Sequence, residues 1–578
     1  MAKVNKIPAN CTDLWIGEEN QIGKGFGSGK PIYQLEPNSY PDSFGGSLNT
    51  TSRRPITASR QRKKGTPIGI EAEGGYNSDL TQDNMQDLMQ GFVFADTRQK
   101  PTATGAVEVD LTGSNPVYES ASTSFDNSVF DEGDLILVSG FSSSNNNGVK
   151  RVLDATGGTV GTDATLEVST TDPTSGATRN LVTASSTTGV RIQKVGFQNA
   201  VGVPNSHGFK IVANTGELPQ LVSESLADLT KWGLVPGEWI YIGGDTADSK
   251  FDADSNNGWA RIKTIDSAND TLTFDKTQGT MVSDNGGGKT IQIYFGRVLK
   301  NENGKENIKR RSYQVERHLG WSDDELVADG TTHVDASGSA VTAGTSLTTV
   351  DNQQCEYLLG SVMNELTMNF SEQSLVTFDV AFFSIDNEQR VQGPLNGKSG
   401  KEKSGLKVSV SGGNRKPAGG DEAFNTTNHF SRLRLAIDDG ETSNPEPLFG
   451  FATEFTLTIN NNLSRNNAIG YFGSFDLTEG QFDVGGSITA YFNDIRAVNA
   501  IRNGADVTLD FAMVNDNKGV LVDMPLIALS SSGLNVTQDD SVKLQVDNEA
   551  AEHRDFKHTV LFNFFDYLPD AAEADLTV

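Results

Sequence analysis

Short runs of alternating apolar and polar residues recur along the whole chain, separated by stretches rich in Ser, Thr, Asn, Gly and Asp. Period-two alternation is typical of β-strands with one buried face, and the intervening composition is typical of turns. Clear examples are residues 134–138, 238–242, 289–295 and 559–565. We therefore predict a mainly β fold.

Two segments have helical periodicity instead. Residues 81–91 begin with Thr81 as a predicted cap and continue with an apolar stripe made of Met85, Leu88, Met89 and Phe92. Residues 493–504 begin with Asn493 as a predicted cap and end at Gly504, which suits a left-handed C-terminal position. The expected stripe of this second helix is Ile495, Val498 and Ile501.

A similar strand precedes each helix, GTPIGIEAEGG at residues 65–75 and GGSITAYF at residues 485–492. This suggests two related units. A second similarity, between residues 365–370 and residues 454–459, follows the first helix but precedes the second. Two explanations of the similarity therefore stay open: a diverged duplication, or a strand followed by a helix in a common local pattern without shared ancestry.

A firmer internal repeat lies between the two helices. Four blocks match in order: 133–140 with 237–244, 147–152 with 257–262, 165–168 with 271–274, and 190–193 with 290–293. Each copy contains Asn-Gly, which suits a tight turn because both residues tolerate positive φ. We predict two copies of a small β-domain, residues 101–200 and 201–299, inserted into the first unit.

The net charge of the chain and its distribution limit the functions that the protein can have. The chain has 578 residues and a net charge of −28, yet residues 1–70 hold ten basic and five acidic side chains. Ordinary DNA binding requires Lys and Arg to neutralise phosphates, so this composition excludes it. Two explanations of the acidity stay open, namely solubility and a surface past which DNA moves without adhering.

Known site motifs are missing from the sequence. There is no run of eighteen apolar residues, no signal-peptide core, no zinc spacing and no catalytic constellation, and two cysteines cannot form a disulfide framework. The glycine-rich residues 23–30 lack the P-loop spacing, so we interpret them as a flexible terminal arm. We expect no enzymatic activity, no cofactor and no metal site.

One basic cluster stands out in this acidic chain. Its members lie within twelve residues and are Arg53, Arg54, Arg60, Arg62, Lys63 and Lys64. A charge run of this kind can be merely solvated, can bind nucleic acid, or can dock on the acidic surface of a neighbouring copy.

Several segments resemble the major tail tube protein family of long-tailed, siphovirus-type bacteriophages. They are EYLLGSVMNELTMNF (356–370), SLVTFDV (374–380), EFTLTINNNL (454–463), AIG (468–470) and GQFDVGGSITAYF (480–492). The resemblance covers roughly residues 45–95, 310–385 and 447–567. It implies β-sandwich units, each flanked by one helix, whose inner sheets join those of neighbours to close rings. Stacked rings would form a tube around a tape-measure protein, and DNA would pass through the lumen without specific binding.

The resemblance and the repeats together predict a domain division. It comprises an N-terminal arm with the first part of tube unit one (1–100), the two inserts (101–200 and 201–299), the remainder of unit one (300–385), a linker (386–446) and tube unit two (447–578). With two units per chain, three chains supply a ring of six folds, while a single unit would require a hexamer. Expected partners are other copies, the tape-measure protein and tail terminator or tip proteins, in the virion tail and, during assembly, in the host cytoplasm.

Strand alternation predicts which residues line the lumen. If Leu366, Met368 and Phe370 face the core, their neighbours face away, and the second unit follows the same pattern. The lumen candidates are Glu365, Thr367, Asn369, Glu454, Thr456 and Thr458. An adhesin that recognises host glycans is the alternative function, and aromatic residues exposed on the inserts would favour it: Trp232, Trp239, Tyr241 and Trp259.

Overall fold

The computed structural model confirms a mainly β protein with large antiparallel sheets. The described residues are 12–27, 29–41, 44–54, 56, 61–120, 129–155, 164–178, 180–199, 208–223, 228–319, 332–334, 340–342, 354–391, 403–404, 415–416, 418–492, 495–530, 533–538 and 541–573. Neither helix within these ranges has the length and apolar character needed to cross a bilayer.

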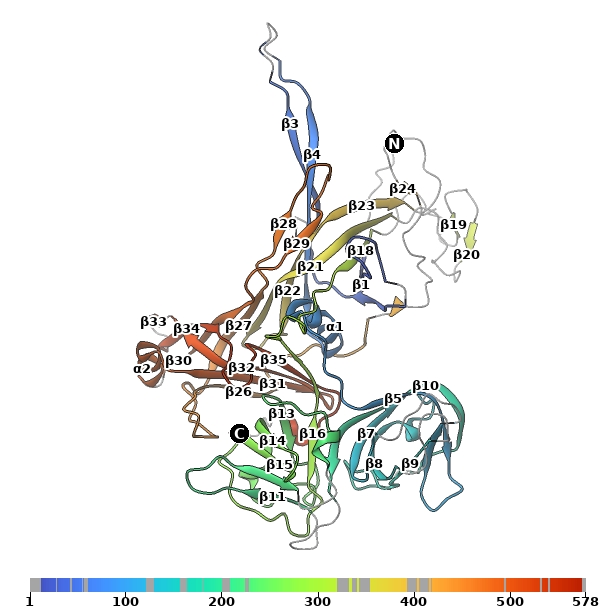
Figure 1. The fold of residues 1–578 in the computed structure, drawn as a ribbon, viewed down its shortest axis with the longest axis vertical. Coiled ribbons are helices and arrows are strands. Elements are labelled where there is room, and N and C mark those ends of the chain that lie inside the picture. The colour runs from blue at the N-terminus through green and yellow to red at the C-terminus, as the bar shows by residue number, and fades with distance from the viewer. Residues whose placement is uncertain are drawn as a thin grey trace.

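A continuous antiparallel sheet runs through the centre of the molecule (Figure 1). Its strands, in spatial order, are β3 (Gly45–Ser52), β4 (Gly65–Asp79), β22 (Thr377–Ser384), β21 (Gln354–Ser371), β27 (Ala452–Asn460), β30 (Asp483–Tyr491) and β34 (Lys543–Ala550). The short strand β33 (Gly533–Asn535) pairs with the far side of β34. This sheet joins segments that are hundreds of residues apart in the sequence.

Two further groups of strands pack over this sheet. One contains β1 (Asp13–Glu18), β2 (Ile32–Leu35), β18 (Tyr313–His318) and β23 (Asp386–Val391), together with the first half of β21. The other contains β26 (Phe430–Ile437), β31 (Val507–Asn515), β32 (Lys518–Leu529), β35 (Leu561–Phe565) and β17 (Arg297–Lys300). A large apolar core fills the space between the layers.

The same sequence of elements occurs twice in the chain. When the strands inserted between them are set aside, the order β3, β4, helix α1, β18, β21, β22 is matched by β27, β30, helix α2, β31, β32, β34. Corresponding strands pair in the same way, because β4 pairs with β3 and β22 just as β30 pairs with β27 and β34. The two sets meet where β21 pairs with β27. This shared topology favours a duplication over the alternative of a common local strand–helix pattern.

Both predicted helices are present. In α1 (Gln82–Val93) the Thr81 hydroxyl accepts a hydrogen bond from the Asn84 amide, and the Asn84 side chain accepts one from Thr81 N–H, so the predicted cap is confirmed. The predicted apolar stripe of α1 is fully buried. In α2 (Arg496–Asn503) the prediction is partly wrong, because Ile495 precedes the helix and is 61% exposed, while Ala500 is buried. Asn493 lies outside the described residues.

The segments between α1 and β17 form a separate body of strands (Figure 1). The first six pair in a closed circuit: β5 (Thr102–Asp110), β6 (Val117–Ser120), β9 (Ala164–Val168), β8 (Gly148–Asp154), β7 (Asp134–Ser139) and β10 (Ala184–Gln198). The next six continue from β10 in the order β16 (Gln292–Phe295), β13 (Trp239–Ile242), β14 (Gly258–Asp266), β15 (Thr271–Thr277), β12 (Gln220–Ser223) and β11 (Phe209–Val212).

The two copies share atomic detail at the Asn-Gly sites. The Asn147 side chain exchanges hydrogen bonds with the backbone of Phe141, and the Asn257 side chain does the same with Phe251. The asparagines do not use the positive φ that they tolerate, since φ is −95° at Asn147 and −103° at Asn257. Only the following glycines have positive φ, since each asparagine serves as a side-chain clamp in extended backbone.

The second copy is anchored to the main body by a buried arginine. Arg261 of β14 is fully buried, and its guanidinium donates to both carboxylate oxygens of Asp275 at 2.7 and 3.0 Å. It also donates to Asp523 of β32 at 3.0 Å and to Thr508 of β31 at 3.2 Å. Burial raises the pKa of Asp523 to about 7, and the charge of Arg261 limits this rise. This contact therefore fastens the insert to the outer strands.

The glycine-rich segment near the N-terminus is not the flexible arm that we expected. The buried carboxylate of Glu19 accepts backbone hydrogen bonds from Gly23, Gly25 and Gly360. The preceding strand β1 supplies Leu14 to the core. The expectation is wrong because one buried carboxylate organises the turn, which composition alone does not reveal.

Candidate functional site: the polar face of the central sheet and its projecting arm

The central sheet has one face in the core and one polar face. On β21, Leu366 and Met368 are fully buried, whereas the alternate residues are partly exposed. On β27, Leu457 and Ile459 are likewise fully buried. The polar face therefore carries the six lumen candidates Glu365, Thr367, Asn369, Glu454, Thr456 and Thr458.

The strand register brings these candidates side by side. Thr367 lies opposite Thr458, and Asn369 lies opposite Thr456. Glu365 and Glu454 lie near opposite ends of the shared ladder, so their carboxylates are far apart along the strands. The two predicted rows are thus one continuous patch at the junction between the two halves of the sheet.

Acidic residues dominate this face. At the alternate positions of β4, β22, β21, β27, β30 and β34 there is no arginine and one lysine, Lys543. Arg465, from the loop between β27 and β30, approaches Glu73 at 3.2 Å. The acidic residues at these positions are Glu71, Glu73, Asp79, Glu365, Asp379, Glu454, Asp483, Asp547 and Glu549.

Neutral side chains hold several of these carboxylates in place. Asp379 accepts hydrogen bonds from Asn77 at 2.9 Å and from Asn369 at 3.0 Å, across three neighbouring strands. Asp483 accepts one from Asn462 at 2.7 Å. Amide donors fix a carboxylate without cancelling its charge, so this face retains its negative potential.

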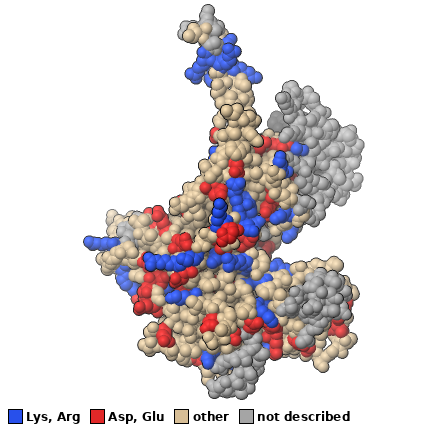
Figure 2. All heavy atoms as spheres, viewed as in Figure 1, with Lys and Arg blue, Asp and Glu red and all other residues tan. Residues whose placement is uncertain are grey.

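The hairpin of β3 and β4 projects well beyond the rest of the molecule (Figure 1). Its basic side chains gather close to the end of the projection (Figure 2). The described members of the predicted cluster are all exposed, namely Arg53, Arg54, Arg62, Lys63 and Lys64. Arg60 lies outside the described residues. We call residues 45–79 the basic arm.

A second loop lies against the base of the basic arm, and sequence reasoning missed it. Residues 461–482 contain the small hairpin of β28 (Ser464–Asn466) and β29 (Asp476–Thr478). The amide of Ile70 donates to the Phe472 carbonyl at 3.0 Å. Aromatic residues crowded between glycines at 470–473 were the available signal. Large apolar side chains exposed in this loop are Ile469, Tyr471, Phe472 and Phe475.

The opposite end of the central sheet also exposes large apolar side chains. Leu375 lies in the turn between β21 and β22, and Phe451 directly precedes β27. Phe451 is 78% exposed and Val536, beyond β33, is 74% exposed. Apolar groups exposed at both ends of one sheet are typical of surfaces that pack against other proteins.

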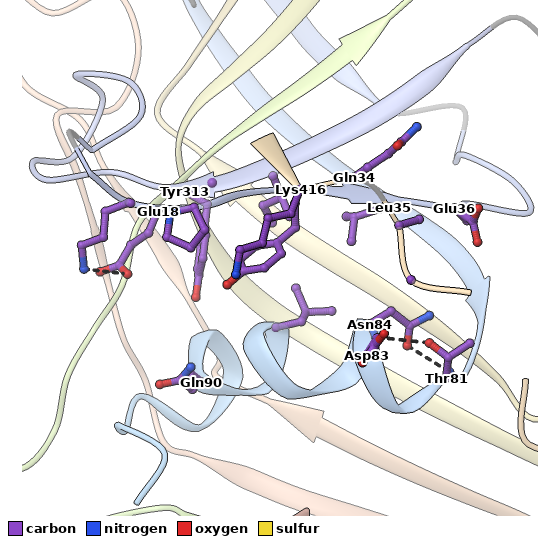
Figure 3. A pocket seen from close by; sticks show the side chains of 18 of the residues that line it. Glu18, Gln34, Leu35, Glu36, Thr81, Asp83, Asn84, Gln90, Tyr313 and Lys416 are labelled. Atoms are coloured by element: carbon purple, nitrogen blue, oxygen red, sulfur yellow. Dashed lines mark hydrogen bonds and ion pairs between the residues drawn. The ribbon is translucent and has the colours of Figure 1, made fainter. Parts of the chain in front are cut away.

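A pocket lies between helix α1 and the strands β1 and β2 (Figure 3). Glu18, on its wall, is paired with Lys30 at 3.1 Å and with Arg311 at 3.0 Å. Asn84, also on the wall, belongs to the helix cap. These polar groups maintain local structure, and the pocket shows no arrangement of nucleophile and base among its described residues.

The four aromatic residues that would have favoured glycan recognition are buried. Trp232 is 1%, Trp239 0%, Tyr241 7% and Trp259 1% exposed. Trp259 stacks edge-on against Phe565 of β35, with ring centroids 5.3 Å apart. They therefore build the core of the insert and its contact with the main body, and they are not available to bind a ligand.

Comparison of the sequence with known protein families identifies the family of this chain. The sequence model of the phage tail tube protein family matches residues 11–550, which is nearly the whole chain. A comparison with curated proteins finds no match. Because the family match spans both halves of the central sheet, the chain belongs to the phage tail tube protein family and has a structural role in the virion tail.

Proposed function

We propose that this protein polymerises into stacked rings that form the phage tail tube and that the polar face of the central sheet lines the channel for DNA. The observation that carries the proposal is the junction of β21 with β27, which joins two halves of equal topology into one sheet with a continuous acidic face. A negative wall offers DNA phosphates no cations on which to stall.

The internal junction is a template for the contact between copies. Within the described residues, β3 and β33 pair on one side only. By the matched order of elements, β3 corresponds to β27. The short strand β33 pairs with β34 in the same way that the C-terminal half of β21 pairs with β22. Pairing β33 of one copy with β3 of the next repeats the β21–β27 junction and removes both open edges.

The duplication within the chain favours three chains per ring of six folds. Each chain supplies two halves of equal topology, so three copies give a wall of six folds with pseudo-sixfold symmetry. A ring of six chains would instead contain twelve such halves. The inserts, attached on the outer strands, then decorate the outside of the wall.

Leu534 offers a direct test of the lateral contact. It lies on β33 and is 48% exposed in the single chain. Leu534→Asp should leave the chain folded and prevent ring formation, because the charge would be buried at the junction. Val182→Asp is the matched control, since Val182 is 47% exposed in the first insert. Rings that form normally with Leu534→Asp would rule out this junction.

We propose that the basic arm makes the contact between stacked rings. Its cationic end is opposite in sign to the acidic remainder of the chain, and such complementarity fixes register between subunits. The apolar residues at the base of the arm and at the opposite end of the sheet supply the surfaces that close around it. The six candidates remain Arg53, Arg54, Arg60, Arg62, Lys63 and Lys64.

Neutralising the arm should separate ring formation from stacking. With these six residues replaced by Gln, we expect single rings in place of long tubes, while a variant with only the four Arg→Lys changes should still polymerise. Tubes of the unaltered protein should shorten as salt rises, since exposed charges are screened. Tubes of normal length with the Gln variant would contradict this role.

Charge reversal tests the lumen assignment. The double variant Glu365→Lys, Glu454→Lys should give tubes that retain DNA at low salt, because each chain gains two cations on the inner wall. Asp254→Lys with Asp266→Lys makes the same change of charge on the second insert and should not retain DNA inside the tube. Equal retention by both variants would refute the assignment.

The remaining assignments follow from the family. We propose the tape-measure protein and tail terminator or tip proteins as partners, assembly in the host cytoplasm, and a non-enzymatic role. The domain division stated above also stays a prediction, and limited proteolysis between 386 and 446 would test the linker. The adhesin alternative has lost its supporting observation, because the insert aromatics are buried.

A further inference from the structure

Four strand positions on the outer layer place metal-binding side chains together. The register sets Asp13 of β1 opposite His318 of β18, and His318 opposite Cys355 of β21. Directly opposed residues on antiparallel strands project from the same face. Glu316, two residues before His318, projects from that face as well. Four potential ligands or supports therefore converge from three strands.

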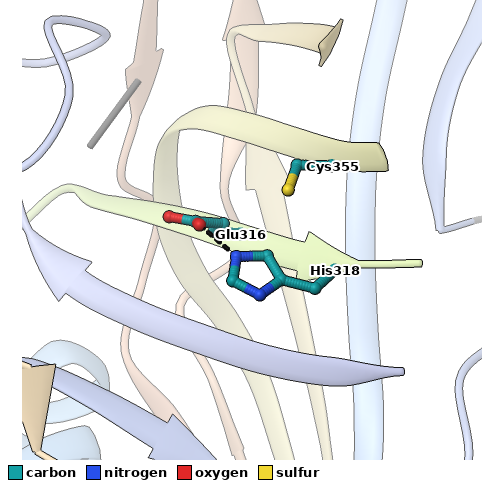
Figure 4. A group of neighbouring side chains, drawn as sticks. All are labelled: Glu316, His318 and Cys355. Atoms are coloured by element: carbon teal, nitrogen blue, oxygen red, sulfur yellow. Dashed lines mark hydrogen bonds and ion pairs between the residues drawn. The ribbon is translucent and has the colours of Figure 1, made fainter. Parts of the chain in front are cut away.

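The side chains are close enough to share one ion. One ligand atom each from Glu316, His318 and Cys355 lies within 4.8 Å of the others. All three residues are buried, at 0, 2 and 1% exposure. Figure 4 shows the Glu316 carboxylate next to one ring nitrogen of His318 and the Cys355 side chain pointing toward the same imidazole ring. Within the described part of the chain, these three residues are the group of His, Cys, Asp and Glu side chains whose ligand atoms lie close enough together to hold a metal ion.

The two nitrogens of His318 have different neighbours. Nδ1 lies 2.9 Å from a carboxylate oxygen of Asp13, and Nε2 contacts the carboxylate of Glu316. In metal sites a carboxylate commonly accepts a hydrogen bond from one imidazole nitrogen and so orients the other toward the metal. Asp13 is placed for that role.

We propose that Glu316, His318 and Cys355 supply three of the four ligands of a Zn²⁺ site, with a water molecule as the fourth ligand and Asp13 as the residue that orients His318. A thiolate, an imidazole and a carboxylate are the donors that zinc takes in proteins, at bond lengths of about 2.0–2.3 Å. Tetrahedral ligands at those lengths are about 3.3–3.8 Å apart. Ligand atoms as far as 4.8 Å apart would move inward by roughly 1 Å, and the Glu316 carboxylate, which contacts Nε2 of His318 directly, would move outward to admit the ion. The ion would fix β1, β18 and β21 in register. This inference is independent of the proposed function.

Cobalt binding gives a readout specific for the sulfur ligand. We would strip the full-length protein with a chelator and titrate it with Co²⁺ and then Zn²⁺. We expect one ion per chain, a thiolate-to-cobalt charge-transfer band, and loss of that band when Zn²⁺ displaces Co²⁺. Zn²⁺ should also raise the melting temperature of the stripped protein.

Variants identify the ligands. Cys355→Ser should abolish the charge-transfer band, while Cys11→Ser, which changes the other cysteine of the sequence, should leave it intact. Asp13→Asn should weaken zinc affinity about 10- to 100-fold and retain the band, as expected for a positioning residue. Circular dichroism would establish that each variant is folded. Absence of stoichiometric binding, or a band unchanged in Cys355→Ser, would overturn the proposal and leave His318 as an ion-pair partner of two carboxylates.

Discussion

Replacing Arg261 by Met should detach the second insert from the outer strands of the main body. The variant keeps most of the side-chain volume and removes the guanidinium that contacts Asp275, Asp523 and Thr508. Asp523 is fully buried, and Asp275 is 5% exposed. Two carboxylates would then lack their cation in a nearly dry site.

The expected cost is large. Removing one partner of a buried ion pair typically costs about 3–5 kcal/mol, because the remaining charge must be buried unpaired or protonated. For a body of 150–250 residues this corresponds to a fall in melting temperature of roughly 6–20 °C. The indole of Trp239 lies 5.8 Å from the Arg261 guanidinium carbon, so tryptophan fluorescence reports on this site directly.

Controls separate charge from packing. Lys263→Met changes a neighbouring cation on the same strand and should cost less than about 0.5 kcal/mol. Adding Asp275→Asn and Asp523→Asn to Arg261→Met should recover much of the lost stability, because no unpaired charge remains. The reasoning is refuted if Arg261→Met alone costs less than about 1 kcal/mol, or if the triple variant is no more stable than the single one.

Three further predictions concern local features of the fold. A Cβ on Gly486 would lie 1.9 Å from the carbonyl oxygen of Thr456, so Gly486→Ala should cost about 3 kcal/mol in chemical denaturation, whereas Gly450→Ala, with open space around it, should be neutral. Burial lowers the pKa of His558 to about 3, so its contribution to stability is full above about pH 6.5 and falls by about 1.4 kcal/mol per unit as the pH drops toward 3. His558→Gln should flatten the stability profile between pH 7 and 5, and an unchanged profile would contradict the assignment. Thr81→Ala should destabilise the protein by about 1 kcal/mol and Thr81→Ser by much less, as measured by thermal unfolding.

Features decided by local sequence were predictable. The Thr81 cap and the stripe of α1 depend on residues within one or two turns of each other, and the structure confirms both. The alternation in 365–371 and 454–460 likewise identified which side chains avoid the core. The pairing of these two segments was not predictable, because their register depends on contacts between residues about ninety positions apart.

Structural features that depend on tertiary contacts could not be predicted from the sequence. The glycine-rich turn after β1 depends on the carboxylate of Glu19, whose role is set by its burial next to Gly360. The cluster around His318 has no metal-binding spacing, since its ligands lie on separate strands. Ile495 was assigned to a helix stripe by periodicity, but the helix begins one residue later and leaves it exposed.

Electron cryo-microscopy of tubes assembled from the purified protein, compared with tails from virions, tests the central claim most directly. We expect stacked rings of three chains, with six similar folds around an open channel, three pairs of outer inserts, and the acidic face of the central sheet toward the lumen. A ring of six chains would contradict the proposed wall of six folds, in which each chain supplies two. Discrete particles without a channel would contradict the tube itself.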